Sequence, residues 1–354
     1  MPKKKGSSVG QSIGGIIAGF DQQIFRTTPP VNELVAKGDR LAPVAASGGG
    51  TMSVGLPDEP DADPAPDATG GAAPDTTAAT ADESPGVSPG DRPDHLLLSA
   101  PGVTAVVDLA VGGRIASLMI GGRELLRTSG DDPIAWGSFP MAPYAGRVRD
   151  ARLRFSGRTW SLPVRMPPHA LHGTVLDRPW QAVDGQTIAT DLGSDWPFAG
   201  RVVQRFELAS DHLTCRMELT ADEPMPASMG WHPWFLRRLP GVAAALELEL
   251  DARSMYRRDE AGIATSVLIS PPPGPWDDCF TDLRRPPVLR WPGFLELAIE
   301  SDCRDWVVYT EPEDALCVEP QTAPPDAVNT DPTVVHPGRP LTAEMTWRWR
   351  TLAR

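Results

Sequence analysis

Residues 103–126, VTAVVDLAVGGRIASLMIGGRELL, decide the fold class of this chain of 354 residues. Short apolar runs alternate here with the glycine pairs Gly112-Gly113 and Gly121-Gly122. Glycine pairs favour tight hairpin turns, because glycine adopts a positive φ without steric penalty. The apolar runs are therefore predicted to be neighbouring antiparallel strands.

The same pattern of short apolar runs separated by turn residues continues to the C-terminus. Ser156-Gly157 and Ser210-Asp211 are predicted turns, and RVVQRFEL at 201–208 alternates with the period of two that a strand requires. No long stretch after residue 94 has helical periodicity. Residues 94–354 are therefore predicted to be one all-β domain, a large antiparallel β-sandwich or barrel. Further strands are predicted in AALELELDA (244–252), LELAIES (295–301), DWVVYT (305–310) and LTAEMTWRWR (341–350).

The N-terminal part has a different composition. Residues 57–91 contain nine acids, seven prolines and no basic or aromatic residue. Such a segment cannot bury enough apolar surface to offset the entropy of ordering, so 57–93 is predicted to be a disordered linker. Residues 1–56 form a small separate segment, which the sequence leaves open between a flexible tail and a docking element.

Charge and composition exclude several classes of function. The net charge of −13 argues against a nucleic-acid partner. No run of 18 apolar residues is present, so no membrane span is predicted, and the short glycine-rich stretch after the basic N-terminus does not fit a signal peptide. The four cysteines form no CxxC pair, which favours reduced thiols in a cytoplasmic protein over a zinc or redox site.

Polar residues suited to chemistry recur where predicted strands end. Each alone has a plain structural explanation, and the HxxH spacing at 169–172 lacks the glutamate of a metalloprotease helix, so no metal is expected. LCVEPQTAPPDAVN at 316–329 brings a carboxylate to the end of an apolar run, where the following proline is expected to end the strand. The candidates are Arg147, His169, His172, His232, Asp277, Asp278 and Glu319.

Together these residues suit a sugar. Aromatic side chains fit the apolar faces of a sugar ring, while arginine, histidine and aspartate bind its hydroxyls. One glutamate and one histidine can serve as base and acid. The chain shows no phosphate-binding glycine loop and no G-x-S-x-G elbow.

In this order and spacing, the segments resemble the aldose 1-epimerase (galactose mutarotase-like) family over about residues 95–352. LCVEPQTAPPDAVN resembles the family's segment around its catalytic glutamate. ALHG (170–173) resembles the segment around a substrate-binding histidine, and GWHPWF (230–235) resembles the catalytic-histidine segment of related bacterial proteins. APYAGRVRDARLRF (142–155) resembles the segment with a sugar-binding arginine. The resemblance implies a sandwich of the galactose mutarotase type that interconverts sugar anomers without a cofactor.

The resemblance also implies roles for individual residues. Glu319 falls at the family's general base and His232 at its general acid. Arg147 and His172 fall at substrate-binding positions. Asp277 falls at the acid that contacts sugar hydroxyls, because Phe280 follows three residues later, and Asp278 is the alternative for that position. His169 stands where the family often has asparagine, so only a supporting role is expected for it.

Two departures concern substrate recognition. The family commonly has Asn-Arg where this chain has Gly146-Arg147, and a histidine where this chain has Asp278. Both leave the identity of the sugar open.

The expected reaction begins with protonated His232 and ionised Glu319. It predicts a bell-shaped pH–rate profile, limited by a carboxylate on the acid side and a histidine on the basic side. Three alternatives stay open: a phosphorylated or sulfonated sugar as substrate, a carbohydrate-binding module without catalysis, or a main function in the N-terminal part. The arginines that would favour an anionic sugar are Arg149, Arg152, Arg165 and Arg178.

Overall fold

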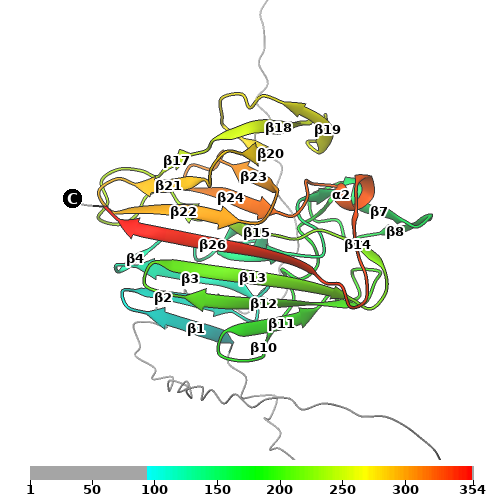
Figure 1. Cartoon of the computed structure of the whole chain (residues 1–354), viewed down its shortest axis with the longest axis horizontal. Coiled ribbons are helices and arrows are strands. Elements are labelled where there is room, and N and C mark those ends of the chain that lie inside the picture. Colours follow the sequence, from blue (N-terminus) through cyan, green and yellow to red (C-terminus); the bar gives the residue numbers. More distant parts are fainter. Residues whose placement is uncertain (1–93, 353–354) are drawn as a thin grey trace, which may run out of the picture. The chain divides into compact units, whose positions relative to one another are not determined.

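The computed structural model describes residues 94–352. The predicted N-terminal segment 1–56 and linker 57–93 lie outside the described residues. Within 94–352 the chain is built from two large antiparallel sheets, so the predicted all-β sandwich is confirmed (Figure 1). No helix of the described residues is long and apolar enough to cross a membrane.

The first sheet has twelve strands, and ten of them lie side by side. The two remaining strands are short: β4 (Arg123–Glu124) pairs with β3, and β16 (Phe235–Leu236) pairs with β24. The order of the ten is β1 (His95–Ala100), β2 (Val103–Asp108), β3 (Arg114–Ile120), β5 (Ser138–Met141), β15 (Gly230–Pro233), β24 (Ala315–Gln321), β23 (Asp305–Tyr309), β20 (Asp277–Leu283), β18 (Ala252–Arg258) and β19 (Ala264–Ile269).

The second sheet has eight strands, in the order β10 (Gln181–Ala182), β11 (Thr187–Asp191), β12 (Gly200–Leu208), β13 (His212–Ala221), β26 (Leu341–Thr351), β22 (Leu295–Ser301), β21 (Val288–Trp291) and β17 (Glu247–Glu249). Short elements complete the described fold. They are the strand pairs β6 (Arg147–Val148) with β9 (Ala170–Leu171), β7 (Arg152–Phe155) with β8 (Arg158–Ser161) and β14 (Met225–Ala227) with β25 (Thr333–Val335), the helix α2 (Ala327–Thr330) and the 3-10 turns Pro133–Ala135 and Arg149–Ala151.

The predicted hairpin turns are present. Gly112, Gly113, Gly121 and Gly122 all have positive φ, and they join β2 to β3 and β3 to β4. At Gly113 a side chain is also excluded, because a Cβ would lie 2.6 Å from the ring of Trp180. The glycine pairs therefore act in the way that the sequence predicts.

The main core lies between the two sheets. Val318 of β24 and Trp231 of β15 belong to the same buried apolar cluster as Phe206 and Trp347 of the second sheet. The side chain of Trp231 points toward the second sheet, because its indole N–H donates to the Gln204 side chain of β12 over 2.9 Å. Since strand residues alternate between faces, the neighbours of Trp231 and Val318 point to the opposite, outer face of the twelve-stranded sheet.

The predicted end of the strand at Pro320 is wrong. β24 continues through Pro320 to Gln321, with Trp306 opposite Pro320 and Val307 opposite Glu319. Proline removes one N–H donor but accepts the extended path, and β15 contributes only a short pairing here, Gly230 opposite Gln321. Glu319 is therefore held inside a central strand, and its side chain points to the outer face.

Candidate active site

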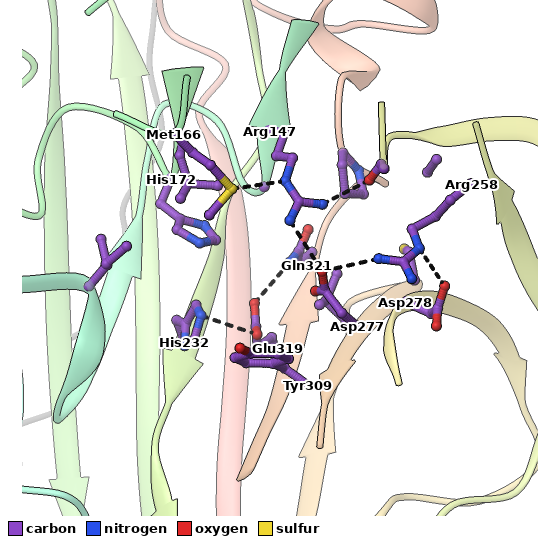
Figure 2. A pocket seen from close by; sticks show the side chains of 18 of the residues that line it. Arg147, Met166, His172, His232, Arg258, Asp277, Asp278, Tyr309, Glu319 and Gln321 are labelled. Atoms are coloured by element: carbon purple, nitrogen blue, oxygen red, sulfur yellow. Dashed lines mark hydrogen bonds and ion pairs between the residues drawn. The ribbon is translucent and has the colours of Figure 1, made fainter. Parts of the chain in front are cut away.

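A pocket of about 320 Å³ lies over the outer face of the twelve-stranded sheet. Its floor comes from the adjacent strands β15, β24, β23, β20 and β18, and loops from residues 132–172 close one side (Figure 2). The structure brings together all the residues that the resemblance assigns to the site. The pocket is lined by Arg147, His172, His232, Asp277 and Glu319, and also by Asp278.

The residues predicted to be the acid and the base are in direct contact. His232 Nε2 lies 3.3 Å from Glu319 Oε1, and their side chains are 7% and 1% exposed. Burial disfavours both charged forms. It raises the pKa of Glu319 well above its ordinary value of 4.5, with the negative charge of Asp277 adding to the effect. It also lowers the pKa of His232 to about 3. Burial therefore favours a neutral acid beside a neutral imidazole over the ion pair.

Aromatic rings hold the imidazole of His232 in place. The Phe139 ring stacks on it with a centroid distance of 4.8 Å, and the Trp234 ring stacks on it at 5.3 Å. Trp234 is fixed in turn, because its indole N–H donates to the Ile134 carbonyl over 2.8 Å. Trp234 also lines the pocket, so it offers an apolar wall to a ligand.

His172 meets His232 edge to face, with ring centroids 4.9 Å apart. Its backbone has φ of 62°, a left-handed conformation that costs energy for a residue with a Cβ. The turn is fixed by the His172 N–H, which donates to the Gly146 carbonyl, and by Gly173, where a Cβ would lie 2.0 Å from the Ala142 carbonyl oxygen. Burial lowers the pKa of His172 well below 6.5, so the ring is neutral.

An arginine–carboxylate network forms the opposite wall. Asp277 Oδ2 accepts from Arg147 Nη2 and from Arg258 Nη1, each over 3.1 Å. Arg258 also reaches Asp278, with Nε 2.9 Å from Oδ1. Both aspartates line the pocket, so the structure leaves Asp278 beside Asp277 as a contact candidate. Burial raises the pKa of Asp278 although Arg258 opposes this shift.

Several lining residues were not predicted from the sequence. Gln321 donates to Glu319 Oε2 over 3.3 Å, and the period-two spacing from Glu319 could have identified it. Tyr309 and Met166 come from β23 and from a loop. Arg258 stands in an arginine-rich strand with no local signal that separates it from Arg253 or Arg257.

The donor set also includes a thiol. His232, Cys317 and Glu319 each place one donor atom within 4.8 Å of the others, a combination of atom types that zinc accepts. Cys317 otherwise packs in an apolar cluster with Phe139 and Trp234, and burial raises the pKa of its thiol well above 9.0. All four cysteines are free and buried.

Other candidates lie outside the pocket. His169 is 5% exposed and accepts from the Asp150 N–H through Nδ1 over 3.0 Å, so it stabilises the loop that follows Arg147. Arg149 pairs with Asp259. Arg165 pairs with Asp132 and Asp177. Among the described residues, the arginines that line the pocket are Arg147 and Arg258.

Gly146 explains the missing asparagine before Arg147. Its φ is +71°, and a Cβ would lie 2.7 Å from the ring of Pro325. Any side chain at this position would therefore meet a rigid neighbour. The loss of that polar contact is compatible with the close packing of residues 146 and 325.

Comparison with known proteins places this geometry in a family. A family model described as Aldose 1-epimerase matches residues 94–348. Over 104 residues the chain is 34% identical to YphB, an uncharacterised protein of Escherichia coli K12. That match covers 27% of this chain and 36% of YphB, so it spans about a third of the relative.

Solved structures share the fold. A protein of Escherichia coli K12, provisionally named an aldose 1-epimerase, has 23% identity and a TM-score of 0.63 over 73% of this chain and 99% of its own. A galactose mutarotase-like protein of Clostridium acetobutylicum has 15% identity and a TM-score of 0.63, with 72% and 95% covered. A GalM/aldose epimerase homologue of C. elegans has 16% identity and a TM-score of 0.62, with 73% and 99% covered. The predicted galactose mutarotase fold is confirmed.

Proposed function

The chain belongs to the aldose 1-epimerase family, and from that premise we propose that it interconverts the α and β anomers of a hexose. The observation that carries the proposal is the buried contact of 3.3 Å between His232 Nε2 and Glu319 Oε1 on the floor of the pocket. A volume of about 320 Å³ is at the lower end of the range for small-molecule sites, about 300–1,000 Å³, and suits a single sugar ring.

The reaction needs one proton accepted and one proton given. Glu319 takes the proton of the C1 hydroxyl while His232 Nε2 protonates the ring oxygen. The bond between C1 and the ring oxygen breaks, and C1 becomes an aldehyde. After rotation about the bond between C1 and C2, the steps run in reverse on the other carbonyl face. Both protons return, so the enzyme ends as it began.

The neutral resting pair is compatible with this mechanism. A neutral Glu319 beside a neutral His232 holds one proton, and so does the reactive ion pair. The two forms differ only by transfer of that proton across the 3.3 Å contact. Substrate hydroxyls in the pocket supply the polar contacts that stabilise the ion pair. His172, kept neutral by its lowered pKa, does not compete with His232 for the positive charge.

The charges of the pocket favour a neutral sugar over a phosphorylated or sulfonated one. Arg147 and Arg258 already bind Asp277 and Asp278. Two arginines that the sequence suggested for an anion are also paired: Arg149 with Asp259, outside the pocket, and Arg165 with Asp177 and with the pocket-lining Asp132. An anionic substituent would have to displace a carboxylate, which costs a charge-assisted hydrogen bond.

The test is anomer exchange measured by NMR at equilibrium, with glucose and galactose, for the wild type and Glu319→Gln. Exchange well above the spontaneous rate in the wild type, and its loss in the variant, is the expected result. Absence of exchange on neutral hexoses, followed by exchange on hexose 6-phosphates, would replace the neutral substrate with an anionic one. Sugar binding without exchange on either class would identify a binding module and refute the proposal.

A further inference from the structure

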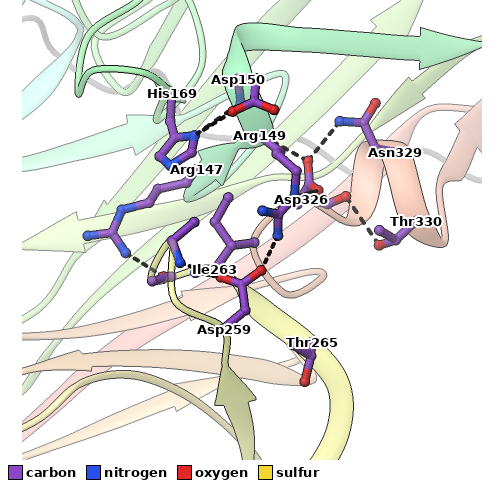
Figure 3. Close-up of polar contacts among 12 residues, drawn as sticks. Arg147, Arg149, Asp150, His169, Asp259, Ile263, Thr265, Asp326, Asn329 and Thr330 are labelled. Carbon is purple, nitrogen blue, oxygen red and sulfur yellow. Dashed lines mark hydrogen bonds and ion pairs between the residues drawn. The ribbon is translucent and has the colours of Figure 1, made fainter.

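The hairpin of β18 (Ala252–Arg258) and β19 (Ala264–Ile269) reaches over the pocket at the sheet edge. Arg258, Gly262 and Ala264 line the pocket, while Asp259 does not. The hairpin tip meets the loop that carries Arg147 and Arg149 (Figure 3). Two segments that are over 100 residues apart in the sequence therefore form one wall.

The base of the tip orients the two aspartates. Arg258 uses Nη1 for Asp277 and Nε for Asp278, so a single rigid guanidinium spans two adjacent carboxylates. Asp277 Oδ2 is shared by Arg258 and Arg147. Because two arginines hold Oδ2, the Asp277 carboxylate cannot rotate freely, and its other oxygen, Oδ1, keeps one orientation.

The tip itself is shaped by Asp259. Asp259 Oδ1 accepts from the Ala261 N–H over 2.9 Å and from the Ile263 N–H over 3.1 Å. Its other oxygen accepts from Arg149. The turn presents the Gly262 carbonyl to Arg147 Nη1 at 2.8 Å. One carboxylate thus both forms the turn and fastens it to the opposite loop.

Arg149 is a fixed partner. Its backbone N–H donates to Asp326 Oδ1 over 3.1 Å, and Asn329 Nδ2 donates to the same oxygen over 2.7 Å. Asp326 is 4% exposed. The ion pair between Arg149 and Asp259 therefore fastens the hairpin to an anchored loop beside α2.

We propose that the β18–β19 hairpin is a substrate-positioning element, in which Arg258 orients Asp277 and Asp278 and the Asp259–Arg149 ion pair holds Gly262 against Arg147. The inference rests on the proposed function, because Arg147 and Asp277 are its sugar-binding residues. Asp259 and Arg258 are positioning residues, which act on the sugar through Asp277 and Arg147.

The first test compares Asp259→Asn with Asp251→Asn. Asparagine at 259 keeps the oxygen that accepts from Ala261 and Ile263 but loses the charge that holds Arg149. Asp251 is the matched control: it precedes β18 at the opposite end, is 28% exposed against 31% for Asp259, and pairs with Arg284 over 2.7 Å. We expect Asp259→Asn to raise KM about two- to fivefold with kcat nearly unchanged, and Asp251→Asn to change neither.

The second test concerns Arg258. Arg258→Met leaves two adjacent carboxylates without their shared cation, and we expect kcat/KM to fall about 10- to 100-fold. Arg258→Lys restores the charge but not the planar guanidinium that contacts both aspartates at once, so it should recover only part of the loss. Full recovery with lysine would overturn the orienting role of the guanidinium.

The closing experiment separates this inference from the proposed function. The dissociation constant of galactose or glucose is measured by NMR titration in Glu319→Gln, with and without Asp259→Asn. Weaker binding in the double variant supports the positioning role without any need for turnover. Unchanged affinity, with fast anomer exchange in the wild type, would refute the hairpin proposal alone. Absence of binding and of exchange with both sugars would refute both proposals.

Discussion

Replacing Glu319 with glutamine should inactivate the protein and, at alkaline pH, make it more stable. The side chain is 1% exposed, and its pKa is raised well above 4.5, chiefly by burial. Glutamine keeps the shape and still offers an oxygen to the side chain of Gln321, which donates over 3.3 Å in the wild type. The variant therefore removes the ionisable group with little change in packing.

The magnitude follows from proton linkage. A group whose pKa is raised in the folded state contributes stability that is fully present below its unfolded pKa and is lost as the pH rises through its folded pKa. Between those two values the folded protein holds the Glu319 proton and the unfolded chain has released it. The free energy of unfolding of the wild type should therefore fall, relative to the variant, by about 1.4 kcal/mol per pH unit. For a domain of this size, that is about 3–5 °C in Tm per pH unit.

The assay combines two measurements. Thermal unfolding of both proteins is followed from pH 5 to pH 9, and anomer exchange is measured by NMR at pH 7. We expect the Tm of the variant to exceed that of the wild type by an increasing margin as the pH rises, and exchange to fall at least about 100-fold. Parallel curves of Tm against pH would show that Glu319 ionises normally in the folded protein, and would refute the neutral resting pair.

Three further predictions follow from the site. The first concerns the pH–rate profile of a pair that holds one proton. The acid limb of the profile should reflect protonation of His232, whose pKa is lowered to about 3, and the alkaline limb should reflect ionisation of Glu319, whose pKa is raised. The pH–rate profile should therefore have a wide plateau across neutral pH, and a narrow bell with limbs near pH 4.5 and 6.5 would contradict it. Gly146→Ala should cost about 2–4 kcal/mol in urea unfolding, because strain adds to the clash with Pro325. Gly157→Ala, with similar φ and open space, should cost only about 1–2 kcal/mol, and equal costs would show that the clash is relieved. Dialysis against EDTA should leave anomer exchange unchanged, because a metal held by His232, Cys317 and Glu319 would block proton transfer. Activity that is lost on chelation and restored by zinc would show that the reaction needs a metal.

Much of the fold could be predicted because its determinants are local. The glycine turns and most of the predicted strands depend on neighbouring residues, and they appear in the structure where the sequence places them. The exception is the strand predicted at 244–252, which is reduced to β17 (Glu247–Glu249), while Ala252 begins β18 in the other sheet. The path of β24 could not be predicted in this way. Whether Pro320 ends a strand depends on what its missing N–H would have bonded, and that is decided by β15, about 90 residues earlier in the chain.

The same distinction between local and non-local determinants applies to the site. Chemical type is local, so a glutamate and a histidine suited to acid–base work can be recognised from their segments. Charge state is not local, because it depends on what buries the group. Phe139 and Trp234 enclose His232 from two different segments, and the contact with Glu319 joins β15 to β24. From the sequence we expected the reaction to begin with protonated His232 and ionised Glu319, whereas burial favours the neutral pair. In the proposed reaction the proton would have to move from Glu319 to His232 against this effect of burial. We therefore expect the hydrogen bonds of a bound sugar to stabilise the ion pair that burial disfavours.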